Sequence, residues 1–299
     1  MVIPEFPDFR EIDMSCKEDI NKLLARFPLE ASEYTFTNFF AFRFTYNFKL
    51  SVLKNNLILV KDTEAVSAFC PVGNSQMKEV LEEVFNYLKG KTDEPYLERV
   101  PESFIETYIN GNGRFVAEEE RDHFDYVHDV KELIELRGNK FHDKRNKVNK
   151  FRGLYEYEYI TVTPDLIDEC LAFEDYWCEV RECEKYYGLD KERCAILQMM
   201  YNFDSLNITG GVIKIDGKIA ALSLGEKFLS DTMVIHVEKA NADIPGLYQV
   251  INQEFLRHEA EDCLYVNREQ DLGIDGLRKA KMSYNPVRLI KKYKVMIKN

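Results

Sequence analysis

The order of predicted secondary-structure elements is the feature that most constrains how this 299-residue chain can fold. In the second half, a strand predicted at 155–162 is followed by two helices, three strands, a helix, a strand, a helix and a last strand at 292–297. Asp216-Gly217 is a strong two-residue hairpin signal between the first two of the three strands. This order predicts an α+β fold, in which helices flank a mixed, mostly antiparallel sheet.

The first half contains the same kinds of elements in a similar order. Three strands are predicted at 49–54, 57–61 and 65–71, with Asn55-Asn56 as the tight turn between the first two. The halves share this order of elements and no visible sequence repeat. We therefore expect two similar units, residues 1–130 and 154–299, joined by a basic linking helix within 131–153.

The composition argues against several classes of protein. No apolar stretch approaches the roughly 20 residues that a membrane helix needs, and Met1–Arg10 lacks the pattern of a signal peptide, so we expect a cytoplasmic protein. Seven cysteines without a CxxC pair are expected to be free thiols, and their spacing predicts no metal site. The sequence also lacks the GxSxG, GxxxxGK[ST] and HExxH motifs, which disfavours a hydrolase, a nucleoside triphosphatase or a zinc protease.

Positive charge is concentrated in two segments, although the net charge of the chain is −12. The first basic cluster (137–152) has seven Lys or Arg residues and one acid, and the second basic cluster (276–299) has eight and no acidic side chain. Two interpretations remain open: solvated faces that balance an acidic body, or a site for an anionic ligand such as phosphate, the tRNA backbone or an acidic head group.

Five segments carry a resemblance to a known family. They are GNKFHDKRNKVNKF (138–151), EKYYGLDKE (184–192), GVIKIDGKIAALSLGEKF (211–228), VIHVEKANADIPGLYQVINQEF (234–255) and YVNREQDLGIDGLRKAKMSYNP (265–286). Together they resemble the C-terminal domain of phosphatidylglycerol lysyltransferases. The resemblance implies tandem acyl-CoA N-acyltransferase (GNAT-like) units, an architecture shared with the Fem peptidyltransferases. It also implies an enzyme that moves an aminoacyl group from charged tRNA to a lipid head group, and a peptide or small acceptor is the alternative here.

The loop at 241–247 bears on the acyl donor. CoA-dependent members of this fold have a glycine-rich loop here, whose backbone N–H groups bind the pyrophosphate. In this sequence the loop has one glycine, a proline without an N–H, and Asp243, which would repel phosphate. We therefore expect aminoacyl-tRNA as the donor and no resident cofactor, with acetyl-CoA as the alternative.

Polar residues gather at the ends of two neighbouring predicted strands, as the chemistry of acyl transfer requires. Such a reaction needs a proton acceptor and a donor to the developing oxyanion. We predict Glu269 or Asp271 as the base or as the clamp on an α-amino group, Arg268 as the anchor for a carboxylate or phosphate, and Asn267 as a hydrogen-bond donor. Glu238, at the end of the other strand, completes the predicted catalytic set. The alternative is a strand end that leads into a solvated loop.

Six further basic residues and one tyrosine are candidates for binding the substrate. The set comprises Lys140, Lys144 and Arg145 on the linking helix, and Arg278, Lys279, Lys281 and Tyr284 on and after the helix at 274–283. Among the histidines, His236 and His258 are interpreted as structural residues. Two rival functions remain, a CoA-dependent N-acyltransferase and a non-catalytic module that binds an anionic ligand.

Overall fold

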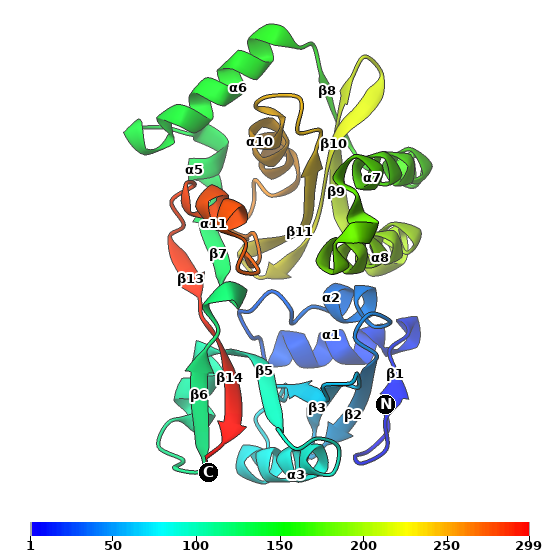
Figure 1. Cartoon of the computed structure of the whole chain (residues 1–299), viewed down its shortest axis with the longest axis vertical. Coiled ribbons are helices and arrows are strands. Elements are labelled where there is room, and N and C mark those ends of the chain that lie inside the picture. Colours follow the sequence, from blue (N-terminus) through cyan, green and yellow to red (C-terminus); the bar gives the residue numbers. More distant parts are fainter. Residues whose placement is uncertain (1, 299) are drawn as a thin grey trace. The chain divides into compact units, whose positions relative to one another are not determined.

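The computed structural model describes residues 2–298 and divides into two compact units (Figure 1). The first unit comprises Met1–Asp125, Gln270–Ile274 and Ile290–Asn299, and the second comprises Tyr126–Glu269 and Asp275–Leu289. Each unit contains a seven-stranded mixed sheet with helices packed on it, as predicted for an α+β fold.

The first unit has the sheet order β1-β2-β3-β4-β5-β14-β6, in which only β4 and β5 are parallel. Its strands are β1 (Arg10–Glu11), β2 (Phe48–Leu53), β3 (Asn56–Lys61), β4 (Ser67–Phe69), β5 (Tyr96–Pro101), β6 (Phe115–Glu119) and β14 (Lys292–Ile297). Its helices are η1 (Met14–Cys16), α1 (Lys17–Arg26), α2 (Phe36–Ala41), α3 (Met77–Lys89), α4 (Glu102–Phe104), η2 (Ile105–Ile109) and η3 (Arg121–His123).

The second unit has the sheet order β13-β7-β12-β11-β10-β9-β8, in which β11 and β12 are parallel. Its strands are β7 (Asp125–Asp129), β8 (Glu158–Thr161), β9 (Thr209–Ile215), β10 (Lys218–Leu229), β11 (Thr232–Ala240), β12 (Tyr265–Asn267) and β13 (Arg288–Ile290). Its helices are α5 (Val130–Glu135), η4 (Asn139–Phe141), α6 (His142–Leu154), η5 (Pro164–Leu166), α7 (Ile167–Arg181), η6 (Cys183–Lys185), α8 (Tyr187–Tyr201), α9 (Phe203–Leu206), α10 (Leu247–Glu259) and α11 (Asp275–Met282).

The two sheets have the same plan, but the C-terminal strand β14 belongs to the first sheet and not to the second. In the second unit, β7 lies between β12 and β13, and in the first unit the C-terminal strand β14 lies between β5 and β6. The expectation that residues 292–297 complete the second sheet was therefore wrong. Alternating residues predict that a segment is a strand, whereas the choice of its partners is made by tertiary packing.

The tight turns follow the sequence signals closely. Asp216 and Gly217 both have positive φ and join β9 to β10, as predicted. The β2–β3 turn is formed by Lys54 and Asn55, one residue earlier than predicted, because Asn56 is buried. The Asn56 amide donates to the carbonyls of Leu53, Lys54 and Ser75, which makes it part of the strand and its surroundings.

The core of the second unit is formed where α10, α5 and α6 pack on the sheet. Apolar side chains of α10 such as Val250 and Phe255 are fully buried there, together with Phe151 of α6. On the other face, the C-terminal part of α7 is linked to the next turn by a disulfide between Cys178 and Cys183, whose Cα atoms are 5.0 Å apart. The expectation of free thiols is wrong for this pair, because the helix end brings the two cysteines within bonding range.

No helix within residues 2–298 combines the length and the apolar character needed to cross a bilayer.

Candidate active site

A β-bulge in β11 determines which side chains of this strand face α10. Leu224 pairs with Val237 and Gly225 pairs with Ile235, so that His236 has no partner opposite it. The extra residue shifts the alternation of side chains along the strand. As a result Glu238 reaches α10, where the amide of Asn252 donates to its carboxylate at 2.7 Å.

The neighbouring strand β12 supplies Arg268, which follows its last residue and completes an ion pair with Glu238. Nη2 of Arg268 lies 2.6 Å from Oε1 of Glu238, and the two side chains are only 10% and 13% exposed. The guanidinium lies over the ring of Tyr284, 4.6 Å from the ring centroid. Nη1 of Arg268 is buried and has no hydrogen-bond partner among residues 2–298.

Lys144 of α6 brings a second cation to the same tyrosine ring. Its ammonium lies 4.1 Å from the ring centroid of Tyr284, and the residue is only 9% exposed. It has no hydrogen-bond or ion-pair partner within the described part of the chain. Burial, Lys147 and Arg268 together lower the pKa of Lys144 to about 8. We name Glu238, Arg268, Tyr284 and Lys144 the cationic cluster, because both cations lie over the Tyr284 ring and only Arg268 pairs with the carboxylate.

This cluster has the electrostatics of an anion site. One carboxylate compensates one of the two positive charges, and the donors of Arg268 Nη1 and Lys144 are unused by protein acceptors. Burial raises the pKa of Tyr284 to about 12, so its hydroxyl stays protonated at neutral pH. Donors held in a buried setting are suited to a carboxylate, a phosphate or a developing oxyanion.

The structure places the other predicted catalytic residues differently. Asn267 is buried, and its side-chain oxygen accepts the backbone N–H of Glu269 at 2.8 Å. The carboxylate of Glu269 lies 2.9 Å from Nδ1 of His236. Asp271 belongs to the first unit, where it is fully buried and accepts from Arg121 and from the N–H of Gly273. Asp271 is therefore not part of the cationic cluster.

The predicted substrate-binding cations divide into several groups. Lys140 pairs with Glu132 on the surface, and Arg145 donates to the carbonyls of Leu136 and Gly138 after the end of α5. Lys281 donates to the carbonyl of Arg268, which places it beside the cationic cluster. Arg278 is half-buried and Lys279 exposed on α11, in the same unit.

The second basic cluster is divided between the units. Its last lysines, among them Lys291 and Lys292, belong to the first unit through β14. The ammonium of Lys292 is fully buried there beside Glu33 and Asp125. From the first basic cluster, Lys144 thus reaches the cationic cluster. From the second basic cluster, Lys281 lies beside it.

Sequence reasoning missed two polar residues around this site. Asn252 lies on a helix face that is mostly apolar, and an asparagine at a core position was the available signal. His128 on β7 is buried, and burial together with Arg268 lowers its pKa to about 3, so it is neutral. Its ring lies edge-on to Tyr284, with the ring centroids 6.3 Å apart.

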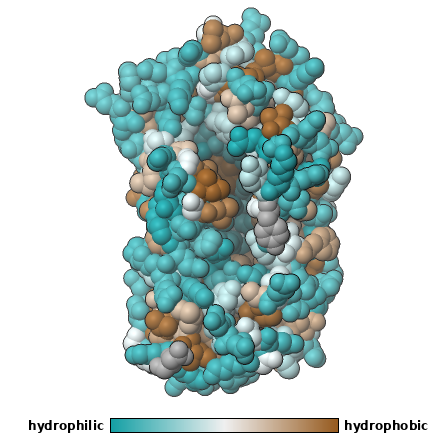
Figure 2. Space-filling model, viewed as in Figure 1, coloured by the Kyte–Doolittle hydropathy of each residue, from teal (hydrophilic) through white to brown (hydrophobic). Residues whose placement is uncertain are grey.

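Two hollows lie in the second unit. In the space-filling view the surface is hollowed beside β11 and α11, and both apolar and hydrophilic residues surround the hollow (Figure 2). A separate cavity of about 700 Å³ lies between α7, the β9–β10 hairpin and the loop after β11; its lining includes Phe173, Tyr176, Ile215, Ile219 and Asn241. Residues 2–298 include no group of three or more His, Cys, Asp or Glu side chains that could hold a metal ion.

The sequence of the chain matches the model of one protein family. The model of the family "Phosphatidylglycerol lysyltransferase, C-terminal" matches residues 24–296. The chain belongs to this family. A curated relative, an uncharacterized protein of Mycoplasmoides gallisepticum, is 24% identical over 177 residues, which cover 58% of this chain and 56% of that protein. The match therefore spans little more than half of the relative's length.

Solved structures resemble the whole chain. A conserved protein of unknown function from Bacteroides thetaiotaomicron is 35% identical, with a TM-score of 0.89 over 97% of this chain and 99% of that one. The C-terminal domain of a putative lysylphosphatidylglycerol synthetase from Agrobacterium fabrum is 14% identical, with a TM-score of 0.68 over 96% and 93%. FemX is 9% identical, with a TM-score of 0.60 over 98% of each chain. These likenesses confirm the predicted fold, a tandem pair of acyl-CoA N-acyltransferase-like units.

Proposed function

We propose that this protein is an aminoacyltransferase that uses the cationic cluster of its second unit to transfer an aminoacyl group from charged tRNA. The observation that carries the proposal is a pair of buried cations with unused donors: Nη1 of Arg268 and the ammonium of Lys144 have no hydrogen-bond partner in the described part of the chain. Such donors stabilise the oxyanion that develops when an ester carbonyl is attacked, or anchor an anionic part of a substrate. Membership of the phosphatidylglycerol lysyltransferase C-terminal family supports the same chemistry.

The transfer step requires one proton acceptor. A hydroxyl or amine of the acceptor attacks the ester carbonyl of the aminoacyl-tRNA, so that a new bond to the carbonyl carbon forms and the bond to the ribose oxygen breaks. The acceptor's proton passes to Glu238 and from there to the leaving ribose oxygen. Arg268 and Lys144 hold the negative charge of the tetrahedral intermediate.

The loop before α10 favours tRNA over CoA as the donor. Gly246 has a φ of +92°, and a Cβ atom there would come within 2.6 Å of the carbonyl oxygen of Lys147, so α6 packs directly on the start of α10. The backbone N–H groups of Asp243 and Ile244 are already bonded to Asn241. A pyrophosphate would therefore meet few free donors and the side chain of Asp243.

The acceptor is proposed to carry a hydroxyl or amine next to an anionic group, either a lipid head group such as phosphatidylglycerol or a peptide. The basic residues Lys281, Arg278 and Lys279 lie in the same unit as the cationic cluster and would favour a negatively charged acceptor. The likeness to a putative lysylphosphatidylglycerol synthetase supports a lipid acceptor. The likeness to FemX supports the alternative of a peptide acceptor, which the resemblance to the Fem peptidyltransferases implies.

The test is transfer of a radiolabelled amino acid from a pool of charged tRNAs. Separate reactions contain phosphatidylglycerol vesicles, a short acidic peptide or neither, and a parallel reaction replaces the tRNA with labelled acetyl-CoA. We expect label on one acceptor from tRNA, a roughly 100-fold or greater loss of kcat in Glu238→Gln, and little change in Lys150→Met, an exposed lysine on α6. Turnover of acetyl-CoA without tRNA-dependent transfer would establish the CoA-dependent alternative. Tight tRNA binding without transfer would establish a binding module.

A further inference from the structure

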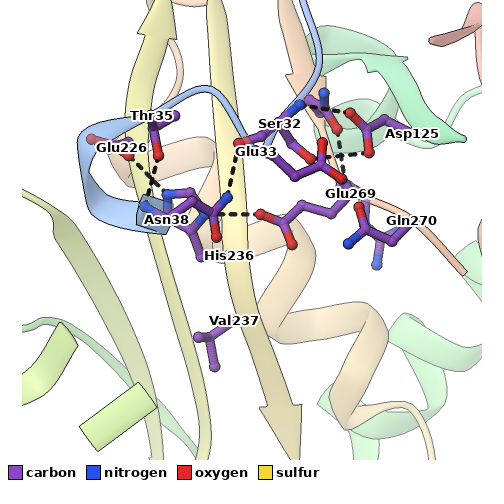
Figure 3. A network of polar contacts seen from close by, with 12 residues as sticks. Ser32, Glu33, Thr35, Asn38, Asp125, Glu226, His236, Val237, Glu269 and Gln270 are labelled. Carbon is purple, nitrogen blue, oxygen red and sulfur yellow. Dashed lines mark hydrogen bonds and ion pairs between the residues drawn. The ribbon is translucent and has the colours of Figure 1, made fainter. Parts of the chain in front are cut away.

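His236 is a buried histidine that lies between two carboxylates. Its side chain is 1% exposed, with Nδ1 2.9 Å from Oε1 of Glu269 and Nε2 2.9 Å from Oε1 of Glu226 (Figure 3). Ionised carboxylates only accept hydrogen bonds, so this arrangement requires a proton on both ring nitrogens. Burial alone would lower the pKa of His236, but the two carboxylates outweigh it and raise the pKa to about 9. The residue is therefore an imidazolium at neutral pH.

The backbone holds His236 in this position through the bulge of β11. The residue opposite the bulge is Gly225, and a Cβ atom there would lie 2.4 Å from the carbonyl oxygen of Val234, so a larger residue does not fit. The bulge thus requires glycine at position 225. It sets His236 towards Glu226 and Glu269 and, two residues later, Glu238 towards Arg268.

The segment that supplies one of the two carboxylates, residues 267–269, has an unfavourable backbone conformation at Glu269. Glu269 has a φ of +55°, in the left-handed region that costs a non-glycine residue roughly 1–2 kcal/mol. The segment is held by hydrogen bonds: Asn267 accepts the N–H of Glu269, and the backbone of Tyr126 pairs with Arg268 and Glu269. The contact from Glu269 to His236 fixes the side-chain end of the same residue.

We propose that His236 is a positioning residue for the cationic cluster: by holding Glu269 it fixes the 267–269 segment, and so directs the Arg268 guanidinium towards Glu238 and over Tyr284. The proposal rests on the proposed function only in taking the cationic cluster as the site of transfer. His236 itself contacts Glu226 and Glu269, and its predicted effect reaches the substrate through Arg268.

The first experiment uses NMR to observe the His236 ring and the Arg268 guanidinium, and it needs no assay of transfer. In ¹⁵N-labelled protein at pH 7.5, both ring nitrogens of His236 should give protonated signals, and Glu226→Gln should lower the pKa of the ring. The Nε–Hε signal of Arg268, identified by its loss in Arg268→Lys, should shift or broaden in His236→Asn and stay in place in His258→Gln. His258 is a suitable control because it is 45% exposed and bonds to a backbone carbonyl within α10. An unmoved Arg268 signal in His236→Asn would overturn the proposal.

The second experiment is a double-mutant cycle in transfer. If His236 acts through Arg268, His236→Asn should lower kcat/KM for charged tRNA by about 10-fold or more, and have little further effect in Arg268→Met. A residue with only a structural role would give multiplying losses in the double variant, and that result would refute the positioning role. If the wild-type protein transfers nothing while the Arg268 signal still responds to His236→Asn, then the proposed function fails and the positioning inference stands.

Discussion

The sharpest prediction is that removing a buried charge from the cationic cluster stabilises the protein while it removes ligand binding. The perturbation is Lys144→Met, which keeps the length and apolar body of the side chain. Lys144 has no hydrogen-bond or ion-pair partner in the described chain, and its pKa is lowered from 10.5 to about 8, mainly by burial. Sites shaped for a ligand commonly carry such a cost in the unliganded protein.

The magnitude follows from the pKa of this one group. A fall from 10.5 to about 8 corresponds to roughly 3 kcal/mol against the charged form in the folded state. The contact with the Tyr284 ring offsets about 1–2 kcal/mol of it. We therefore expect Lys144→Met to raise the free energy of unfolding by about 1–2 kcal/mol at pH 7, or the melting temperature by about 2–8 °C.

The sign can be checked by varying the pH. A lysine whose pKa is depressed by folding destabilises the folded state fully at pH values below about 8, and the penalty disappears as the pH rises towards 10.5. The stability difference between variant and wild type should therefore be largest at neutral pH and vanish near pH 10.5. The assay is urea unfolding at several pH values, with Lys150→Met as the exposed control on the same helix. A variant that is destabilised by 1 kcal/mol or more at pH 7 would refute the reasoning.

Three further predictions concern stability. The difference between wild type and His236→Asn should be largest below about pH 6.5 and shrink as the pH rises through about 9, because folding raises the pKa of His236; urea midpoints across this range test it. Lys292→Met should cost about 3–5 kcal/mol, since Asp125 would remain buried without its cation, and an unchanged melting temperature would contradict this. Gly225→Ala should cost more than about 2 kcal/mol because of the clash in the bulge, whereas Gly153→Ala in α6, where a Cβ has open space, should stabilise by up to about 1 kcal/mol; thermal melts of both variants decide the point.

Local signals in the sequence predicted most elements of the fold. Asp216-Gly217 joined its two strands as expected, and the amphipathic pattern at 246–260 became α10. The same signals could not predict that β14 belongs to the first sheet, because the partners of a strand depend on contacts far away in the sequence. They also could not predict the disulfide, which depends on how the end of α7 directs Cys178.

The composition of the cationic cluster was predicted in part. The sequence placed Glu238, Arg268, Lys144 and Tyr284 among the functional candidates, and the structure brings these four together. It could not separate Asp271 from them, because the change of unit directly after Glu269 leaves no mark in a polar run. It also treated His236 as an ordinary structural histidine, since its two carboxylate partners are distant in the sequence.

The most direct test of the account is the affinity of the protein for charged and uncharged forms of one tRNA. If the cationic cluster receives the aminoacyl ester, wild type should bind the charged form at least about 10-fold more tightly, a difference of roughly 1.4 kcal/mol. Arg268→Met should remove this preference and leave the affinity for uncharged tRNA nearly unchanged. Equal affinity of the wild-type protein for both forms, or a preference that survives Arg268→Met, would contradict a role for the cluster in aminoacyl transfer.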